Sequence, residues 1–239
     1  MEQVNKDRSL VSKVMDGLVT GIVEEKYGAV LPPQDVLSKE FDVSRTVMRE
    51  ALSMLLARHM LDVRPKIGTR IRAMRDWRMI DEEVVNWRFR AKPDPDFLRD
   101  VIEFRMLIEP RATAQAASRA SAAEIAGIRD AFNAFREIRP TEPGYQQAEE
   151  LLHTRIVVAS GNQFFQQMAA IVRGALSTVN PIVTQKEGLW ETVVHTHARV
   201  VDAIEKHDAK EAEAASRALI DCTADEICKA FSAERPAAV

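Results

Sequence analysis

Two histidines and a glutamate occur at positions where their side chains could bind one cation. Glu149 and His153 are four residues apart in a segment with helical periodicity, so they lie on one face of a helix. His197 lies on a later helical segment whose apolar residues would turn it inward. The alternative interpretation is a polar, hydrogen-bonded pocket of the same side chains without a metal.

Arg105 and Glu109 form a second pair, also four residues apart on one helix face. A guanidinium binds a carboxylate through two hydrogen bonds, so Arg105 is the candidate residue for holding an anionic ligand. The alternative is a structural ion pair between Arg105 and Glu109.

A third group of polar residues begins a short helix in the N-terminal part of the chain. Ser44 is a suitable N-cap residue, and Arg45 and Arg49 follow one turn apart on a face that the apolar residues leave free. Arginines at these positions can reach the edges of guanines in a major groove. Ser44 and Thr46 lie where hydroxyls and helix N-terminal amides bind phosphate oxygens.

The residues after this helix predict a basic β-hairpin. The segments LDVRP and TRIRA alternate β-branched and charged residues around a turn that contains Gly68. Lys66 and Thr69 flank this glycine, whose missing side chain permits close approach of the backbone to DNA. Two helices, an arginine-bearing helix and a basic hairpin, in this order, indicate a DNA-binding domain. The alternative is that these cationic residues only solubilise a small domain.

Hydrophobic periodicity predicts the elements that position these groups. Helices are expected at 9–25, 33–40 and 44–58 before the hairpin, and a short helix is expected around 84–87. Beyond a boundary at KPDP, helical stretches are predicted at 94–120, 122–138, 144–160, 162–186, 189–206 and 208–233. Pro110 and Pro181 fall inside two of them and should kink or split them. The prediction is therefore a mainly α fold with a DNA-binding domain at 1–75, a linker with a short helix at 76–93 and an all-helical domain at 94–233.

Composition and charge agree with this organisation. The 239 residues are 46% hydrophobic and 29% charged, which is typical of a globular protein and excludes disordered and low-complexity classes. The sequence has no run of about 20 apolar residues and no secretory h-region, so we expect a cytoplasmic protein without a membrane partner. The net charge is −3, yet residues 43–75 hold eight Arg and Lys against two acidic residues, Glu50 and Asp62. A basic module joined to an acidic one is typical of an electrostatic footprint for DNA.

The segment LPPQDVLSKEFDVSRTVMREALSMLLARHMLDVRPKIGT resembles the winged helix-turn-helix of GntR-type bacterial transcription regulators, over about residues 10–72. The family pattern reads LPSER, then VSRTPVREAL, then a hairpin ending in GxGT. Asp35 stands where the family usually has a DNA-contacting Arg, Val47 replaces a Pro, and Lys66 replaces the first Gly of the hairpin. The resemblance implies binding to palindromic operator DNA through Ser44, Arg45, Thr46, Arg49, Lys66, Gly68 and Thr69. The change at Asp35 is expected to shift operator preference.

The segments FRMLIEPRATAQAA, LLHTRIVVASGN and THARVVDAIEKHDAKEAEAA resemble the FCD effector domain of one GntR subfamily, over about 95–230. This resemblance implies a bundle of six or seven helices around a pocket, and in many members a divalent metal held by Asp and three His. Glu149, His153 and His197 match three of these positions, and Leu219 stands at the fourth, where it cannot bind a metal. The resemblance therefore implies a site of two imidazoles and one carboxylate, which suits Zn²⁺, Ni²⁺ or Mn²⁺ with open coordination positions. The segment DEEVVNWRF and the missing third His also resemble a branch that responds to sugar acids such as galactonate.

The sequence thus predicts a homodimeric, ligand-responsive transcription factor, with repression relieved by the effector. The expected effector is a small organic acid, with a sugar acid as the narrower prediction, bound by Arg105, Glu149, His153 and His197. One alternative is a metal-sensing regulator that responds to Zn²⁺ or Ni²⁺ itself. Another is an enzyme, since two His and a carboxylate can activate water. No recognised motif supplies a separate general base or nucleophile, so we expect no enzymatic activity.

Overall fold

The computed structural model describes residues 2–91, 95–183 and 189–233, with side chains described for 10–91, 95–176 and 190–225. The chain divides into two compact units, residues 1–91 and 92–239. Nearly all regular structure is helical, and a two-stranded antiparallel sheet lies in the first unit. This confirms the predicted mainly α fold class. Within these described ranges, no helix is long and apolar enough to cross a membrane.

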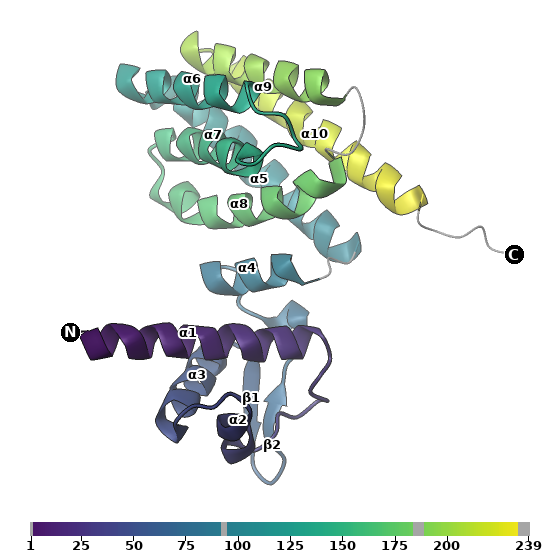
Figure 1. Ribbon diagram of the computed structural model, residues 1–239. Coiled ribbons are helices and arrows are strands. Elements are labelled where there is room, and N and C mark those ends of the chain that lie inside the picture. The colour runs from purple at the N-terminus through teal and green to yellow at the C-terminus, as the bar shows by residue number, and fades with distance from the viewer. Residues whose placement is uncertain (1, 92–94, 184–188, 234–239) are drawn as a thin grey trace, which may run out of the picture. The chain divides into compact units, whose positions relative to one another are not determined.

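The first unit contains four α-helices, a hairpin and a 3₁₀ turn. In order these are α1 (Glu2–Val23), α2 (Gln34–Glu40), α3 (Arg45–Ala57), β1 (Leu61–Arg64), β2 (Gly68–Ile71), η1 (Met74–Asp76) and α4 (Glu82–Arg90). Figure 1 shows α2, α3 and the hairpin on one side of α1, with α4 on the other. The predicted order of two helices, an arginine-bearing helix and a hairpin is thereby confirmed.

Apolar side chains from all parts of this unit share one core. Leu18 of α1, Leu37 of α2 and Leu55 of α3 are fully buried in it. Trp77 and Trp87 belong to the same core, and the indole nitrogen of Trp87 donates a hydrogen bond to Asp16 on α1 at 2.6 Å. Residues 76–91, predicted as a linker, therefore pack into the first unit because their tryptophans are buried there. Residues 92–94, at the predicted boundary, lie outside the described residues.

The hairpin pairs Leu61 with Ile71 and Arg64 with Gly68. A short extended segment pairs with the free edge of β2, since the amide of Leu31 donates to the carbonyl oxygen of Thr69 at 2.8 Å. The turn requires left-handed backbone at two positions, with φ of +66° at Lys66 and +106° at Gly68. A lysine with left-handed backbone is under steric strain, and a glycine at the same position would not be.

The second unit is an all-helical bundle. Its helices are α5 (Pro95–Arg119), α6 (Ala122–Arg136), α7 (Tyr145–Ala159), α8 (Gln163–Val183), α9 (Leu189–Glu205) and α10 (Ala209–Ala233). The prolines do not split their helices, because α5 continues through Pro110 and α8 through Pro181, and a kink at either position stays a prediction. Helix α5 packs against α7, α9 and α10, and this packing outweighs the single backbone hydrogen bond that Pro110 removes.

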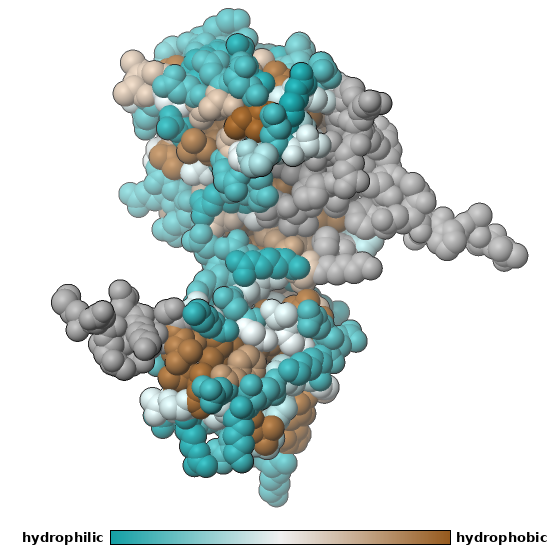
Figure 2. Space-filling model, viewed as in Figure 1, coloured by the Kyte–Doolittle hydropathy of each residue, from teal (hydrophilic) through white to brown (hydrophobic). Residues whose placement is uncertain are grey.

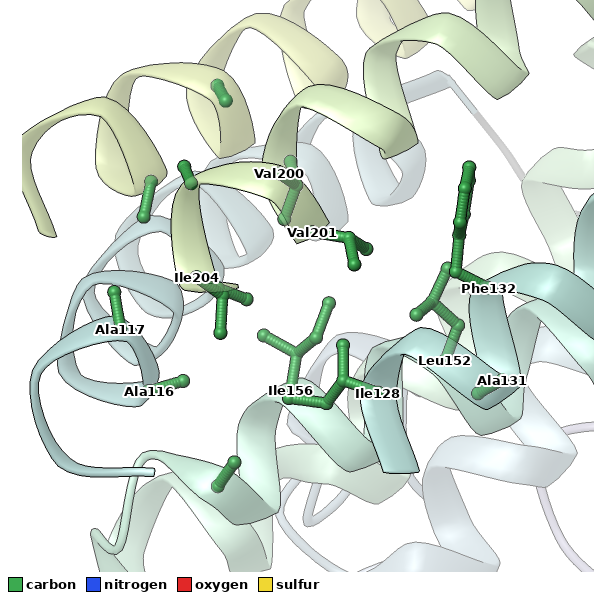
Figure 3. Close-up of a cluster of buried hydrophobic side chains, with 14 of the residues drawn as sticks. Ala116, Ala117, Ile128, Ala131, Phe132, Leu152, Ile156, Val200, Val201 and Ile204 are labelled. Atoms are coloured by element: carbon green, nitrogen blue, oxygen red, sulfur yellow. The ribbon is translucent and has the colours of Figure 1, made fainter. Parts of the chain in front are cut away.

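The core of the bundle lies between α5, α6, α7, α9 and α10. Figure 3 shows Ala116 and Ala117 of α5 at one end of this cluster, with Ile204 of α9 and Ile156 of α7 in its middle. Phe132 of α6 lies at the other end of this cluster, next to Leu152. Small alanines on α5 allow close helix packing, and this brings polar residues of α5, α7 and α9 together at the edge of the core.

Candidate functional site

Three buried side chains of the second unit converge where metal ligands were predicted. Glu149 and His153 lie on consecutive turns of α7, and His197 comes from α9. All three are at least 95% buried. One oxygen or nitrogen atom from each lies within 4.8 Å of the others. The two histidines are 44 residues apart in the sequence and lie on different helices, and the fold brings them into one cluster of potential ligands.

Each histidine has one ring nitrogen committed to a hydrogen bond with an acceptor. Nδ1 of His197 lies 2.7 Å from the carbonyl oxygen of Val193, and Nδ1 of His153 lies 2.9 Å from a carboxylate oxygen of Glu109. Because both partners accept, both Nδ1 atoms must carry the hydrogen. The Nε2 atoms of His153 and His197 are left facing each other at 3.2 Å.

Glu109 is ionised, which makes it an acceptor for His153. Burial by itself would raise the pKa of this carboxyl group, but the charge of Arg105 and the hydrogen bond from His153 outweigh burial and lower the pKa to about 2. Arg105 donates to Glu109 through Nε and Nη2, so the predicted pair on one helix face is an ion pair. The remaining nitrogen of Arg105, Nη1, is buried without a hydrogen-bond partner.

His197 is neutral at neutral pH. Burial, and next the charge that His153 carries when both its ring nitrogens are protonated, lower the pKa of His197 to about 3. With Nδ1 protonated, the lone pair of His197 is on Nε2 and points at the cluster. A neutral imidazole with a free Nε2 is the form that binds metals.

The third side chain of the cluster also has a partner that orients it. The hydroxyl of Tyr145 hydrogen-bonds to the carboxylate of Glu149, and burial followed by the charge of Glu149 raises the pKa of Tyr145. Aromatic rings enclose this side of the cluster: the Phe135 ring centroid lies 4.8 Å from that of His197 and 5.4 Å from that of Trp190. Partners of this kind fix ligand orientation in metal sites.

A small cavity of about 10 Å³ opens beside the two histidines. It has room for about one water molecule or one ion. Leu219 of α10 and Val200 of α9 form part of its apolar wall. The polar side chains of Thr113 and Ser216 also line the cavity. Leu219 thus faces the cluster at the position where a further ligand could stand. Arg105 and Glu149 do not line this cavity, and the structure brings Arg105 to Glu109 instead.

The residues predicted to bind DNA are at the surface of the first unit. Ser44 caps α3, with its hydroxyl accepting from the amide of Val47 at 3.2 Å, as predicted. Arg45, Thr46 and Arg49 are exposed on the first turns of α3. Figure 2 shows mainly hydrophilic side chains at the lower end of this unit, where α2 and the hairpin turn lie in Figure 1.

The turn of the hairpin presents a cationic residue two positions before the glycine. Lys66 and Gly68 are exposed in the turn, whereas Thr69 is half-buried and uses its carbonyl group in pairing with Leu31. Ile67, at the tip, is 62% exposed. The turn therefore offers a cation and one apolar side chain to any partner.

Two features of the clusters were not predicted. Glu109 was considered with Arg105 alone, and its bond to His153 depends on the packing of α5 on α7, which the sequence does not reveal. Tyr145 lies four residues before Glu149, the spacing of neighbours on one helix face, and this signal could have indicated their contact.

Comparison with known proteins identifies both units. Residues 10–71 match the model of bacterial regulatory proteins of the gntR family, and residues 100–221 match the FCD domain. The chain belongs to the GntR family, in the group that carries an FCD domain. It is 26% identical to the galactonate operon transcriptional repressor of Escherichia coli, over 83% of this chain and 88% of that protein.

Two further comparisons agree with this membership. The GntR regulator described here is 30% identical to the putative L-lactate dehydrogenase operon regulatory protein of E. coli, over 88% of this chain and 83% of that one. It shares the fold of the Listeria monocytogenes protein Lar, with a TM-score of 0.60 at 14% identity, over 94% and 97% of the two chains. The predicted membership of the GntR family is therefore confirmed. GntR regulators bind operator DNA and act as dimers.

Proposed function

We propose that this GntR regulator is a repressor that releases its operator when its FCD domain binds a small organic acid. DNA binding is assigned to residues 1–75 and effector binding and dimerisation to residues 94–233, with the protein acting in the cytoplasm. Two relatives are named for a galactonate operon and an L-lactate dehydrogenase operon. Galactonate and lactate are both 2-hydroxy carboxylates, so we propose an effector of this class, with sugar acids first among its members.

The observation that carries the effector proposal is the 3.2 Å approach of the two Nε2 atoms. With both Nδ1 atoms protonated, two neutral rings would point lone pairs at each other, which is unfavourable. A divalent cation bound to both rings and to Glu149 removes this repulsion, and the donor set suits Zn²⁺, Ni²⁺ or Mn²⁺. Such a metal would supply Lewis-acid positions for the carboxylate and hydroxyl oxygens of the effector.

The protein's own residues prepare this site. Glu109 and the carbonyl group of Val193 hold the two rings in one tautomer, and Tyr145 holds Glu149. Leu219 supplies no ligand, which leaves positions that an effector can fill. Arg105 keeps Glu109 ionised, and its unpartnered Nη1 is the group that we propose attracts the effector's negative charge.

The competing interpretation is a metal-free pocket, in which His153 carries a second proton and donates it to Nε2 of His197. The opposite charge of Glu109 would balance that imidazolium. The two interpretations differ in whether a chelator changes effector binding.

The test is a thermal-shift titration of the full chain with Zn²⁺, Ni²⁺ or Mn²⁺ and with 2-hydroxy acids, before and after chelation. A ligand at 100 times its Kd stabilises a protein by about 2.7 kcal/mol, which raises the midpoint by a few degrees. We expect stabilisation by metal, further stabilisation by a hydroxy acid and loss of both with chelator. His197→Ala should abolish both effects, and His195→Ala, an exposed neighbour on α9, should keep them.

Other outcomes would reject parts of the proposal. Acid binding that persists with chelator would support the metal-free pocket. Operator release by metal alone, with every acid silent, would favour the metal-sensing regulator. A coupling of about 1–3 kcal/mol between effector and operator corresponds to roughly a 5- to 150-fold change in operator affinity, which is the range we expect.

At the DNA, we propose that two copies of α3 read the half-sites of a palindrome through Arg45 and Arg49. Ser44 and Thr46 would bind phosphates, and the hairpin would do the same through Lys66, Gly68 and Thr69. The basic charge of residues 43–75 and the exposure of Arg45 and Arg49 support this assignment.

A further inference from the structure

We propose that Asp35 determines operator specificity by fixing the direction of the Arg45 guanidinium. This inference rests on the proposed contact of α3 with DNA. Nη2 of Arg45 lies 3.0 Å from Oδ2 of Asp35, so the first turn of α2 is tied to the first residue of α3. The neighbouring Gln34 donates from its side-chain amide to the carbonyl oxygen of Arg45 at 2.9 Å. Two consecutive residues of α2 thus hold the side chain and the backbone of Arg45.

The ion pair is too exposed to serve mainly as a stabilising contact. The side chains of Arg45 and Asp35 are 76% and 58% exposed, and exposed pairs of this kind contribute little to folding. Helices α2 and α3 are already joined by burial of Leu37, Met48 and Ala51 in one core. The effect of the pair is therefore on where the guanidinium points.

A fixed guanidinium is better suited to bases than to phosphates. Arg45 has five N–H groups, so a bond to Asp35 leaves enough donors for a two-bond contact with guanine. The carboxylate cancels the charge of Arg45 locally, which weakens sequence-independent attraction to phosphates. Asp35 also carries a second oxygen, and a carboxylate at a major-groove edge accepts from the amino group of cytosine. The pair should therefore prefer a G·C base pair at this position and bind other sequences weakly.

The chain offers a matched control for the charge of Asp35. Asp42 is an exposed acid in the turn between α2 and α3, and its backbone φ of +50° is one that asparagine tolerates. Within the part of the chain that the structure describes, the carboxylate of Asp42 makes no hydrogen bond or ion pair with Arg45, whose carboxylate partner is Asp35. Asp42→Asn therefore removes the same charge beside α3 without releasing Arg45.

The experiment uses the full chain and a DNA duplex that the unmodified chain selects from a random pool. The specificity ratio is the Kd for a scrambled duplex divided by the Kd for the selected duplex, at one salt concentration. Asp35→Asn should tighten binding to scrambled DNA, weaken binding to selected DNA and lower the ratio by about tenfold, part of the discrimination that one two-bond base contact gives. Asp42→Asn should tighten both and leave the ratio unchanged.

A double variant decides whether Asp35 acts through Arg45. In an Arg45→Ala background, Asp35→Asn should cause no further fall in the ratio, because coupled residues are not additive. Equal ratios for Asp35→Asn and Asp42→Asn, or additive losses in the double variant, would overturn the inference. If Arg45→Ala and Arg49→Ala both leave the ratio unchanged, the proposed DNA-reading face is wrong, which is a distinct result.

Discussion

Glu109 accepts a hydrogen bond from Nδ1 of His153 at 2.9 Å, across helices α5 and α7. The same carboxylate is paired with Arg105 on its own helix. A buried charge is thus shared between a cation and a potential metal ligand. Replacing the carboxylate without changing its shape separates its effect on His153 from simple loss of packing.

Glu109→Gln should weaken metal binding. The neutral amide is a poorer acceptor for His153 and leaves Arg105 without its counter-ion, and loss of such an orienting partner lowers metal affinity by about 10- to 100-fold. Competition with a chromogenic chelator measures this affinity. Glu103→Gln, at an exposed position of the same helix, serves as the control and should bind as the parent does. Equal affinities for the two variants would contradict the orienting role of Glu109.

Leu219→His should change the affinities of the site for metal and for effector in opposite directions. Leu219 lines the cavity next to His197, so an imidazole there can fill a coordination position that is otherwise open. We expect tighter metal binding and weaker effector binding, measured by calorimetry with Zn²⁺ and with a 2-hydroxy acid. Leu219→Asn introduces polarity without an imidazole, and it should not tighten Zn²⁺ binding. Unchanged Zn²⁺ affinity in the histidine variant would place position 219 outside the coordination sphere.

Arg49→Ala should lower the affinity for selected operator DNA by about 1–3 kcal/mol without unfolding the protein. Arg49 is exposed on α3, so its side chain contributes little to the core. Gel-shift or anisotropy titrations with selected and scrambled duplexes measure the loss, and circular dichroism checks the fold. Arg75→Ala removes an exposed charge outside α3 and should affect both duplexes alike. Unchanged binding by the Arg49 variant would reject its role in base reading.

Glu40 should make a pH-dependent contribution to the free energy of unfolding of the first unit. Hydrogen bonds from Lys26 and then Tyr27 lower the pKa of Glu40 below its ordinary value of 4.5. Because the folded pKa is the lower one, this contribution is present above pH 4.5 and is lost as the pH falls through the folded pKa. Glu40→Gln should therefore be less stable than the parent at pH 7, by about 0.5–1.5 kcal/mol.

Urea denaturation at pH 7 and at pH 3 tests this dependence. The difference between the Glu40→Gln variant and the parent should shrink at the lower pH. Glu24→Gln, at an exposed position just after α1, is the control and should differ little from the parent at either pH. A difference of the same size at both pH values would show that the carboxylate charge is not its source.

Much of this fold follows from local patterns. The helices of the FCD domain begin and end close to where apolar periodicity and capping residues placed them, since those signals lie within each segment. Neither Pro110 nor Pro181 splits its helix, and for α5 the packing against α7, α9 and α10 offsets what the proline destabilises. Tertiary packing also decided the place of Trp77 and Trp87, whose burial in the first core no local pattern reveals.

For the candidate site, too, local patterns indicated the residues but not the contacts between helices. Glu149 and His153 follow from helical spacing, and the inward face of α9 indicated His197. The link from Glu109 to His153 required knowledge of which faces of α5 and α7 meet. The ion pair between Asp35 and Arg45 similarly depends on the angle between α2 and α3, so the sequence indicated a missing cation at position 35 but not its bonded partner.

The aromatic contacts beside the histidines give the FCD domain an intrinsic fluorescence probe of the site. Trp190 packs against Phe135, which in turn packs against His197. A ligand that moves His197 changes the surroundings of an indole through one intervening ring, whereas Trp77 and Trp87 are enclosed in the other unit. Ultraviolet emission from Trp190 should therefore report occupancy of the site directly, so effector screening can proceed on the unlabelled protein in real time.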